Sequence, residues 1–218
     1  MGFAGKVWRL LVGIKDGLVL ILMLLFFSAL FAILTARPSP GAVREGALVM
    51  DLSGMEVANA SLLDEGTAAA EGMAMLFAAR PRAQAKEGRN RFLVDAAVFP
   101  QTLSVMRTRA AHLAIDLQVV TREAMLSVAA EGDVFGCLVQ YPDADGEVED
   151  LTAMTSGMAD LGVRTVFATD LMAMLLLKSP GAMGADVVVG SSQRFGVPMG
   201  YGGPHAAFFA AKETFKRH

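Results

Sequence analysis

The chain has 218 residues, 54% of them apolar, which suits one domain with a short additional segment. A formal charge of −3 and the lack of a basic patch argue against nucleic acid as a partner. Cys137 is the single cysteine, which excludes an internal disulfide and a cysteine-based metal site, and the apolar run 134–139 around it predicts an inert buried thiol.

The first predicted element is an apolar helix near the amino terminus. Residues 17–36 form a run of twenty uncharged residues rich in Leu, Phe, Ile and Val. A helix of this length spans roughly 30 Å, the thickness of a bilayer's hydrocarbon core. A cleaved signal peptide is the alternative, but its apolar region is usually about 7–15 residues long and ends in small residues, whereas Leu34 stands at that site here. We therefore expect a membrane anchor with its linker in residues 1–45 and a domain in residues 46–218.

The flanks of this span predict its orientation. Lys6, Arg9 and Lys15 precede it. Arg37 and Arg44 follow it. Because positive charge tends to stay on the cytoplasmic side, we expect a single-pass protein with a cytoplasmic amino terminus.

The amino-terminal segment resembles a known leader. Val7-Trp8-Arg9 stands before the span, Pro38-Ser39-Pro40 follows it, and residues 46–54 read Gly-Ala-Leu-Val-Met-Asp-Leu-Ser-Gly. This order resembles the start of signal peptide peptidase A, the membrane-anchored protease IV, over about residues 1–54. The family's serine nucleophile and lysine base have no matching motif here, so the resemblance implies an anchor and no protease activity.

The rest of the chain alternates between strand and helix patterns. Apolar runs predict strands at 47–51, 91–95, 116–120, 135–140, 164–169, 186–189 and 206–210. Helices are predicted at 100–113, at 147–161, and after the capping pattern of Ser61 and Asp64, where Leu63, Thr67, Ala70, Ala74 and Phe77 recur at helical spacing. Residues 80–91 read as a solvated loop. Such alternation predicts an α/β fold with a mainly parallel sheet.

Separated sequence words in this region resemble one enzyme family. They are Asn59-Ala-Ser-Leu-Leu-Asp-Glu, Phe92-Leu-Val-Asp, Pro100-Gln-Thr, Val139-Gln-Tyr-Pro, Gly146-Glu-Val and the glycine-rich tract 193–205. Together they resemble the amino-terminal half of the glycine cleavage P-protein, the pyridoxal-phosphate-dependent glycine dehydrogenase (decarboxylating), over about residues 54–218. The resemblance implies a partial fold-type I PLP-transferase-like large domain, preceded here by the predicted transmembrane helix. Both resemblances meet at 52–55, which indicates a chimera, and a gene-fusion product without selected function stays an alternative.

The same resemblance argues against catalysis by this chain alone. In the family's active half a lysine precedes a similar glycine-rich turn, but Gln193 stands at the matching position. Lys178 and Lys212 lack the glycine-rich context. A pyridoxal enzyme needs a lysine for its Schiff base. The resemblance therefore implies no covalently bound cofactor, no catalytic residue in this chain, and the catalytic half of a P-protein as a partner.

Individual residues allow a functional and a structural interpretation. Asp170 ends a strand, where a pyridoxal enzyme places the carboxylate that pairs with the pyridine nitrogen, but we favour a helix cap or loop acid. His205 suits either a half–half interface or a structural loop. His112 fits a helix end. The acids between 143 and 150 lack calcium-loop spacing and are predicted to form a solvated turn, not a metal site. His218 is the last residue of the chain.

Overall fold

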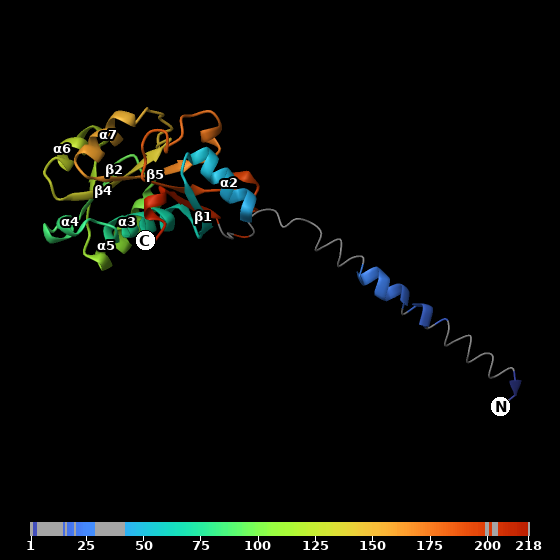
Figure 1. The fold of residues 1–218 in the computed structure, drawn as a ribbon. Helices are drawn as coiled ribbons and strands as arrows, with labels where there is room; N and C mark the ends of the chain where they lie inside the picture. The colour runs from blue at the N-terminus through green and yellow to red at the C-terminus, as the bar shows by residue number, and fades with distance from the viewer. Residues whose placement is uncertain are drawn as a thin grey trace. The chain divides into compact units, whose positions relative to one another are not determined.

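The computed structural model describes residues 2–3, 15, 17–19, 21–28, 42–198, 201 and 205–217. The chain divides into two compact units, Met1–Ala42 and Val43–His218. The second unit contains the β-sheet and the helices that pack against it (Figure 1).

The described part of the first unit does not bear out the predicted membrane anchor. Among the described residues, we find no helix with both the length and the apolar character that crossing a membrane demands. Residues 20 and 29–36 of the predicted span lie outside the described residues. The predicted single-pass membrane location, with a cytoplasmic amino terminus, is therefore wrong.

A seven-stranded sheet forms the centre of the second unit, with the order β1-β7-β6-β5-β4-β2-β3. The strands are β1 Val57–Leu62, β2 Arg91–Asp95, β3 Asp116–Val120, β4 Val134–Tyr141, β5 Arg164–Asp170, β6 Val187–Ser191 and β7 Ala207–Ala211. The pairs β2/β3, β2/β4, β4/β5 and β5/β6 are parallel, whereas β7 is antiparallel to both β6 and β1. This mixed but mainly parallel sheet confirms the predicted α/β class.

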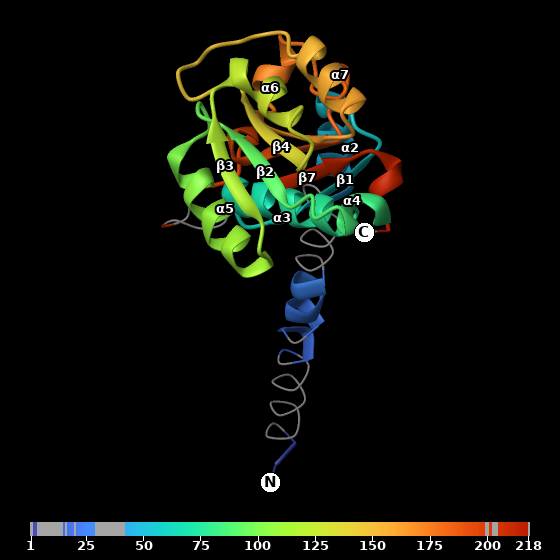
Figure 2. The ribbon, with the colours of Figure 1, turned by 90° about the vertical axis from the view of Figure 1, so that its left-hand side faces the viewer.

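Helices cover both faces of the sheet, as parallel crossovers require. The helices are α2 Ala42–Ser53, α3 Glu65–Ala78, α4 Arg82–Lys86, α5 Pro100–Leu113, α6 Met125–Ala129 and α7 Thr152–Asp160. Short 3-10 turns are η1 Arg122–Ala124, η2 Ala173–Leu175, η3 Gln193–Phe195 and η4 Glu213–Phe215. Figure 2 shows α3 and α5 on one side of the sheet and α6 and α7 on the other.

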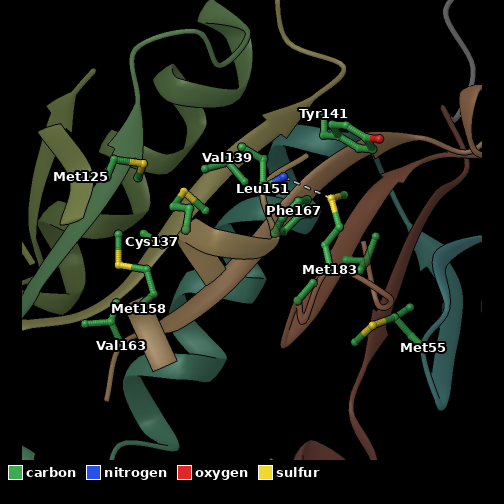
Figure 3. Packing of buried hydrophobic residues seen from close by; sticks show 14 of the residues in the cluster. Met55, Met125, Cys137, Val139, Tyr141, Leu151, Met158, Val163, Phe167 and Met183 are labelled. Atoms are coloured by element: carbon green, nitrogen blue, oxygen red, sulfur yellow. Dashed lines mark hydrogen bonds between the residues drawn. The ribbon is translucent and has the colours of Figure 1, made fainter. Parts of the chain in front are cut away.

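Two hydrophobic clusters fill the spaces between the sheet and these helices. All eight residues of the central strand β4 are buried. Because side chains alternate across a strand, Leu138 joins the cluster beneath α3 and α5, whereas Cys137 and Val139 join the cluster beneath α6 and α7. Figure 3 shows Cys137 beside Met158 of α7 in the second cluster. The prediction that Cys137 is a buried thiol is confirmed.

Residues 47–51 form part of helix α2 and not the strand predicted from their apolar run. Val49 is 1% exposed and Ser53 is fully buried, so one helical turn places both against the rest of the unit. The carbonyl of Ser53 accepts a 2.8 Å hydrogen bond from the Gly181 amide. A short apolar run does not distinguish a buried strand from the inner face of a helix.

Two further segments form elements that the sequence did not predict. The segment 57–62, in which we predicted no strand, forms β1 through antiparallel pairing with β7. The predicted loop 80–91 contains the short helix α4.

The predicted helix 147–161 begins only at Thr152. The carboxylate of Asp143 accepts hydrogen bonds from the Asp145 and Glu147 amides, at 3.0 and 2.8 Å, and so holds the preceding residues in a turn. Sequence patterns do not reveal this competition between a side chain and the helix for backbone amides.

Candidate functional site

Polar side chains gather where the parallel strands end. β2 ends at Asp95, β5 at Asp170 and β6 at Ser191, and α3 begins beside this end of the sheet at Glu65. We call this side of the sheet the carboxyl edge. In open α/β sheets the crevice at this edge is where ligands bind.

Asp170 is tied to its neighbours on the carboxyl edge. One carboxylate oxygen accepts a 3.0 Å hydrogen bond from the Met172 amide, so the residue acts as a turn cap. The other oxygen forms an ion pair with the guanidinium of Arg194, which belongs to η3, directly after β6. The structural interpretation of Asp170 as a loop acid therefore fits, with an arginine as the partner of its charge.

A small cavity of about 230 Å³ opens at the start of α3. Its lining residues are Asp64, Glu65, Gly66, Phe99, Gln101, Thr102, Val105, Ser191 and His205. The capping box of α3 fixes one wall, because Asp64 Oδ1 accepts from the Thr67 amide at 2.7 Å while Thr67 Oγ1 accepts from the Asp64 amide at 3.1 Å. The cap thus pairs Asp64 with Thr67, whereas the sequence pattern paired it with Ser61.

Glu65 is the ionisable group that this cavity perturbs most. Burial raises the pKa of its carboxyl group to about 7, and the charges of Asp170 and Asp64 act in the same direction. Hydrogen bonds from Thr102 and Gln140 oppose the rise; the Thr102 hydroxyl lies 3.1 Å from Glu65 Oε1. Our sequence analysis missed Glu65. Its position just after a capping aspartate, at the start of a largely buried helix, was the available signal.

A buried ion network crosses the carboxyl edge at β2. Arg122 donates to Asp95 Oδ2 through Nε at 2.8 Å and Nη2 at 2.6 Å, and its Nη2 lies 3.4 Å from Asp143 Oδ2. Asp95 is 2% exposed and Asp143 7% exposed. Burial opposes the charge of Arg122, but Asp95 and Asp143 outweigh it and raise the pKa of the guanidinium. Asp143 is therefore a buried turn residue and not the solvated acid predicted.

The histidines for which we predicted roles lie in different environments. His205 lines the cavity, and its amide donates to the Leu63 carbonyl at 3.1 Å. His112 lies in the last turn of α5, with Nδ1 3.0 Å from the Thr108 carbonyl, as a helix-end residue should. His218 lies outside the described residues. Within the described parts of the chain, no three His, Cys, Asp or Glu side chains converge as metal ligands would.

The side chains of Lys178 and Lys212 are both engaged away from the cavity. Lys212 Nζ binds Asp186 Oδ1 at 2.8 Å, near the amino end of β6. Lys178 Nζ binds Asp150 Oδ2 at 3.1 Å. The backbone amide of Gln193, the residue that we compared from the sequence with the family's lysine, donates to Ser191 Oγ at 3.1 Å.

Comparison with known proteins gives one consistent result. The sequence model of the family described as "Glycine cleavage system P-protein" matches residues 45–218. Glycine dehydrogenase (decarboxylating) of Dechloromonas aromatica is 55% identical over 170 residues, which cover 78% of this chain and 17% of that protein. The putative mitochondrial glycine dehydrogenase (decarboxylating) of Schizosaccharomyces pombe is 50% identical over 170 residues, or 78% and 16%.

Solved structures show the same fold. A crystal structure of glycine decarboxylase (P-protein) of the glycine cleavage system, in inhibitor-bound form, superposes with a TM-score of 0.68 at 30% identity, covering 89% of this chain and 46% of that one. The metB protein of Corynebacterium glutamicum, at 17% identity and a TM-score of 0.54 over 76% of this chain and 40% of that one, shares the fold alone. The chain spans less than a fifth of the length of the curated relatives it matches. Residues 46–54, which we compared with the protease leader, lie inside the family match.

Proposed function

The chain belongs to the glycine cleavage system P-protein family, and we propose that it acts as a non-catalytic part of a glycine dehydrogenase (decarboxylating). One observation carries this proposal. At the carboxyl edge this chain has Gln193 and Arg194, the stretch that the sequence resemblance aligns with the family's lysine, and Arg194 is paired with Asp170.

The carboxyl edge does not fit covalently held pyridoxal phosphate. Such enzymes form a Schiff base with a lysine and pair the pyridine nitrogen with a carboxylate. Asp170 supplies a carboxylate, but Arg194 already neutralises it. No lysine lines the described cavity, and Lys178 and Lys212 bind other acids. We therefore derive no catalytic step through this cofactor for the chain alone.

Exposed apolar side chains next to the carboxyl edge support a partner. Leu175 and Leu176, in and after η2, are 57% and 91% exposed, and Phe195 of η3 is 37% exposed. These two segments follow the neighbouring strands β5 and β6. Large apolar side chains on a surface mark interaction sites when they gather in a patch. We propose that this surface contacts the lysine-bearing half of a P-protein.

A reconstitution experiment tests this function. The full chain is mixed with a lysine-bearing P-protein half, and association and glycine decarboxylation are measured with each component alone as a reference. We expect no aldimine absorbance and no decarboxylation from the chain alone, and a complex with restored activity in the mixture. A borohydride-reducible aldimine on one lysine of this chain would overturn the non-catalytic role.

Two matched variants locate the contact. Leu176→Asp places a charge on the proposed surface and should weaken the complex at least tenfold. Leu113→Asp is the control. Leu113 is 39% exposed and is the last residue of α5, outside the proposed surface, so this change should leave the affinity unchanged. Equal effects of the two variants would contradict the proposed surface.

A further inference from the structure

Exposed apolar side chains of the second unit gather on the carboxyl edge. Among its described residues, eight large apolar side chains are exposed, of which Leu48 in α2 and Leu113 at the end of α5 lie elsewhere. The other six lie in segments that follow β1, β4, β5 and β6 or precede β7, namely Leu63, Val148, Leu175, Leu176, Phe195 and Tyr201. Because β7 is antiparallel to both β1 and β6, all these strand ends lie on the carboxyl edge. The surface proposed above, after β5 and β6, is therefore the centre of a wider apolar face.

One carboxylate connects the two turns at the centre of this face. We call residues 171–177 the η2 turn and residues 193–197 the η3 turn. Asp170 Oδ1 accepts a 3.0 Å hydrogen bond from the Met172 amide in the η2 turn, and Asp170 Oδ2 forms the ion pair with Arg194 in the η3 turn. Both turns are fully described, and no other hydrogen bond or ion pair joins one to the other.

The two turns benefit from such a link because each is short. η2 and η3 have three residues each, and 3-10 hydrogen bonds have poorer geometry than those of an α-helix. A single turn fixes several backbone dihedral angles in exchange for one hydrogen bond. A partner that must first order both turns binds more weakly than one that meets them already in place. A link that holds the two turns together before binding therefore raises the affinity of the surface.

We propose that Asp170 is a positioning residue, which joins the η2 and η3 turns into one contact surface for the lysine-bearing half of a P-protein. The identity of this partner rests on the proposed function, whereas the coupling of the turns requires only this chain. A pyridoxal enzyme uses a carboxylate to pair with the pyridine nitrogen of its cofactor. In this chain the carboxylate at the end of β5 pairs with Arg194 and orders a protein surface instead.

The ion pair acts on the surface and not on the global fold. The Arg194 side chain is 64% exposed and that of Asp170 is 29% exposed. Exposed ion pairs contribute little to stability, so a variant of Arg194 should unfold at the same temperature as the wild type. The effect is expected where a partner excludes water from the pair and needs both turns in a fixed arrangement.

Amide hydrogen exchange of the full chain, without a partner, tests the coupling. Arg194→Gln removes the charge that pairs with Asp170. Exchange in residues 171–177 should become about threefold faster, although the substitution lies in the other turn. Lys216→Gln is the matched control: Lys216 is 62% exposed and pairs with Glu213 at 2.8 Å beside η4, which follows β7 at the opposite edge. This control should leave exchange in residues 171–177 unchanged.

Affinity for the lysine-bearing half supplies the second measurement. Asp170→Asn keeps an oxygen that can accept from the Met172 amide but removes the charge. Asp170→Asn and Arg194→Gln should each reduce the affinity about three- to fivefold. The double variant should lose no more than either single variant, because both remove the same contact. Arg194→Lys should keep the wild-type affinity, since a single nitrogen, Nη1, makes the pair. Lys216→Gln should again have no effect.

The outcomes separate this inference from the proposed function. If the wild-type chain forms no complex with the lysine-bearing half, the proposed function is wrong, whereas faster exchange of residues 171–177 in Arg194→Gln would still support the coupling. Unchanged exchange in both Arg194→Gln and Asp170→Asn would overturn the inference and leave the proposed function intact. Additive losses of affinity in the double variant would also overturn it, because they would show that each side chain contacts the partner independently.

Discussion

Replacing Gly181 with alanine should detach helix α2 from the rest of its unit. A Cβ atom at position 181 would overlap the carbonyl of Gly54 and lie 2.9 Å from its Cα atom. These neighbours are backbone atoms, so no side-chain rotation can relieve the overlap. The chain at Gly54, directly after α2, would have to move away from residue 181.

The cost follows from what that movement separates. The 2.8 Å hydrogen bond from the Gly181 amide to the Ser53 carbonyl would lengthen, at about 1 kcal/mol. Val49, now 1% exposed, and Met55, 6% exposed, would lose part of their burial, which is worth about 1.5–3 kcal/mol for a whole side chain. We expect the free energy of unfolding to fall by about 2–4 kcal/mol. For a unit of this size that lowers Tm by roughly 5–15 °C.

Thermal unfolding of the full chain, followed by circular dichroism, measures this change. Gly72→Ala is the matched control, since a Cβ atom there would meet only ordinary contacts at 3.4 Å or more inside helix α3. That substitution should be neutral or should stabilise by up to about 1 kcal/mol. A Tm for Gly181→Ala within error of the wild type would refute the docking of α2, and an equal loss in Gly72→Ala would show that the effect is not specific.

Three further predictions concern ionisable groups. Asp186→Asn weakens the contacts of this carboxylate with Arg164, Lys212 and the Thr165 amide, so the free energy of unfolding in urea should fall by about 2 kcal/mol. The control Asp150→Asn changes an exposed carboxylate and should leave the urea midpoint unchanged. Burial raises the pKa of the Cys137 thiol, so a thiol reagent should modify it only as the protein unfolds; rapid modification of the native chain would contradict its burial. The pKa of Glu65, raised from 4.5 to about 7, makes the folded state hold a proton longer, so stability should fall by up to about 3 kcal/mol as pH rises through this window, and Glu65→Gln should lack this slope.

Local patterns predicted the parts of the fold whose signals are local. The strands 91–95 and 116–120 and the helix 100–113 match β2, β3 and α5 at both ends. In α5 the proline at the first turn and the left-handed Ala114 after the last turn mark the boundaries. Alternation of strands and helices was sufficient for the α/β class, because parallel strands need helical connections.

Long-range contacts decide the parts that the sequence did not predict. The segment 57–62 contains Ala58, Asn59 and Ala60, which are weak strand formers, and it becomes a strand because β7 offers an edge. Arg122 looks like an ordinary surface arginine until β2 and β4 bring Asp95 and Asp143 to it. Neither interaction leaves a pattern within a window of a few residues, so a sequence periodicity cannot show it.

The word Leu52-Ser53-Gly54 shows why resemblance misplaced the start of the family domain. A word of three residues occurs in many sequences, and we placed the meeting point of the leader and family resemblances there. In the structure each meets a constraint within the same unit: Leu52 packs on the core, the Ser53 carbonyl accepts from the Gly181 amide, and Gly54 takes a positive φ of 70°. A leader would have no reason to meet these constraints. The family match from residue 45 therefore includes most of α2, whose residues Val49 and Leu52 pack into the core of this unit.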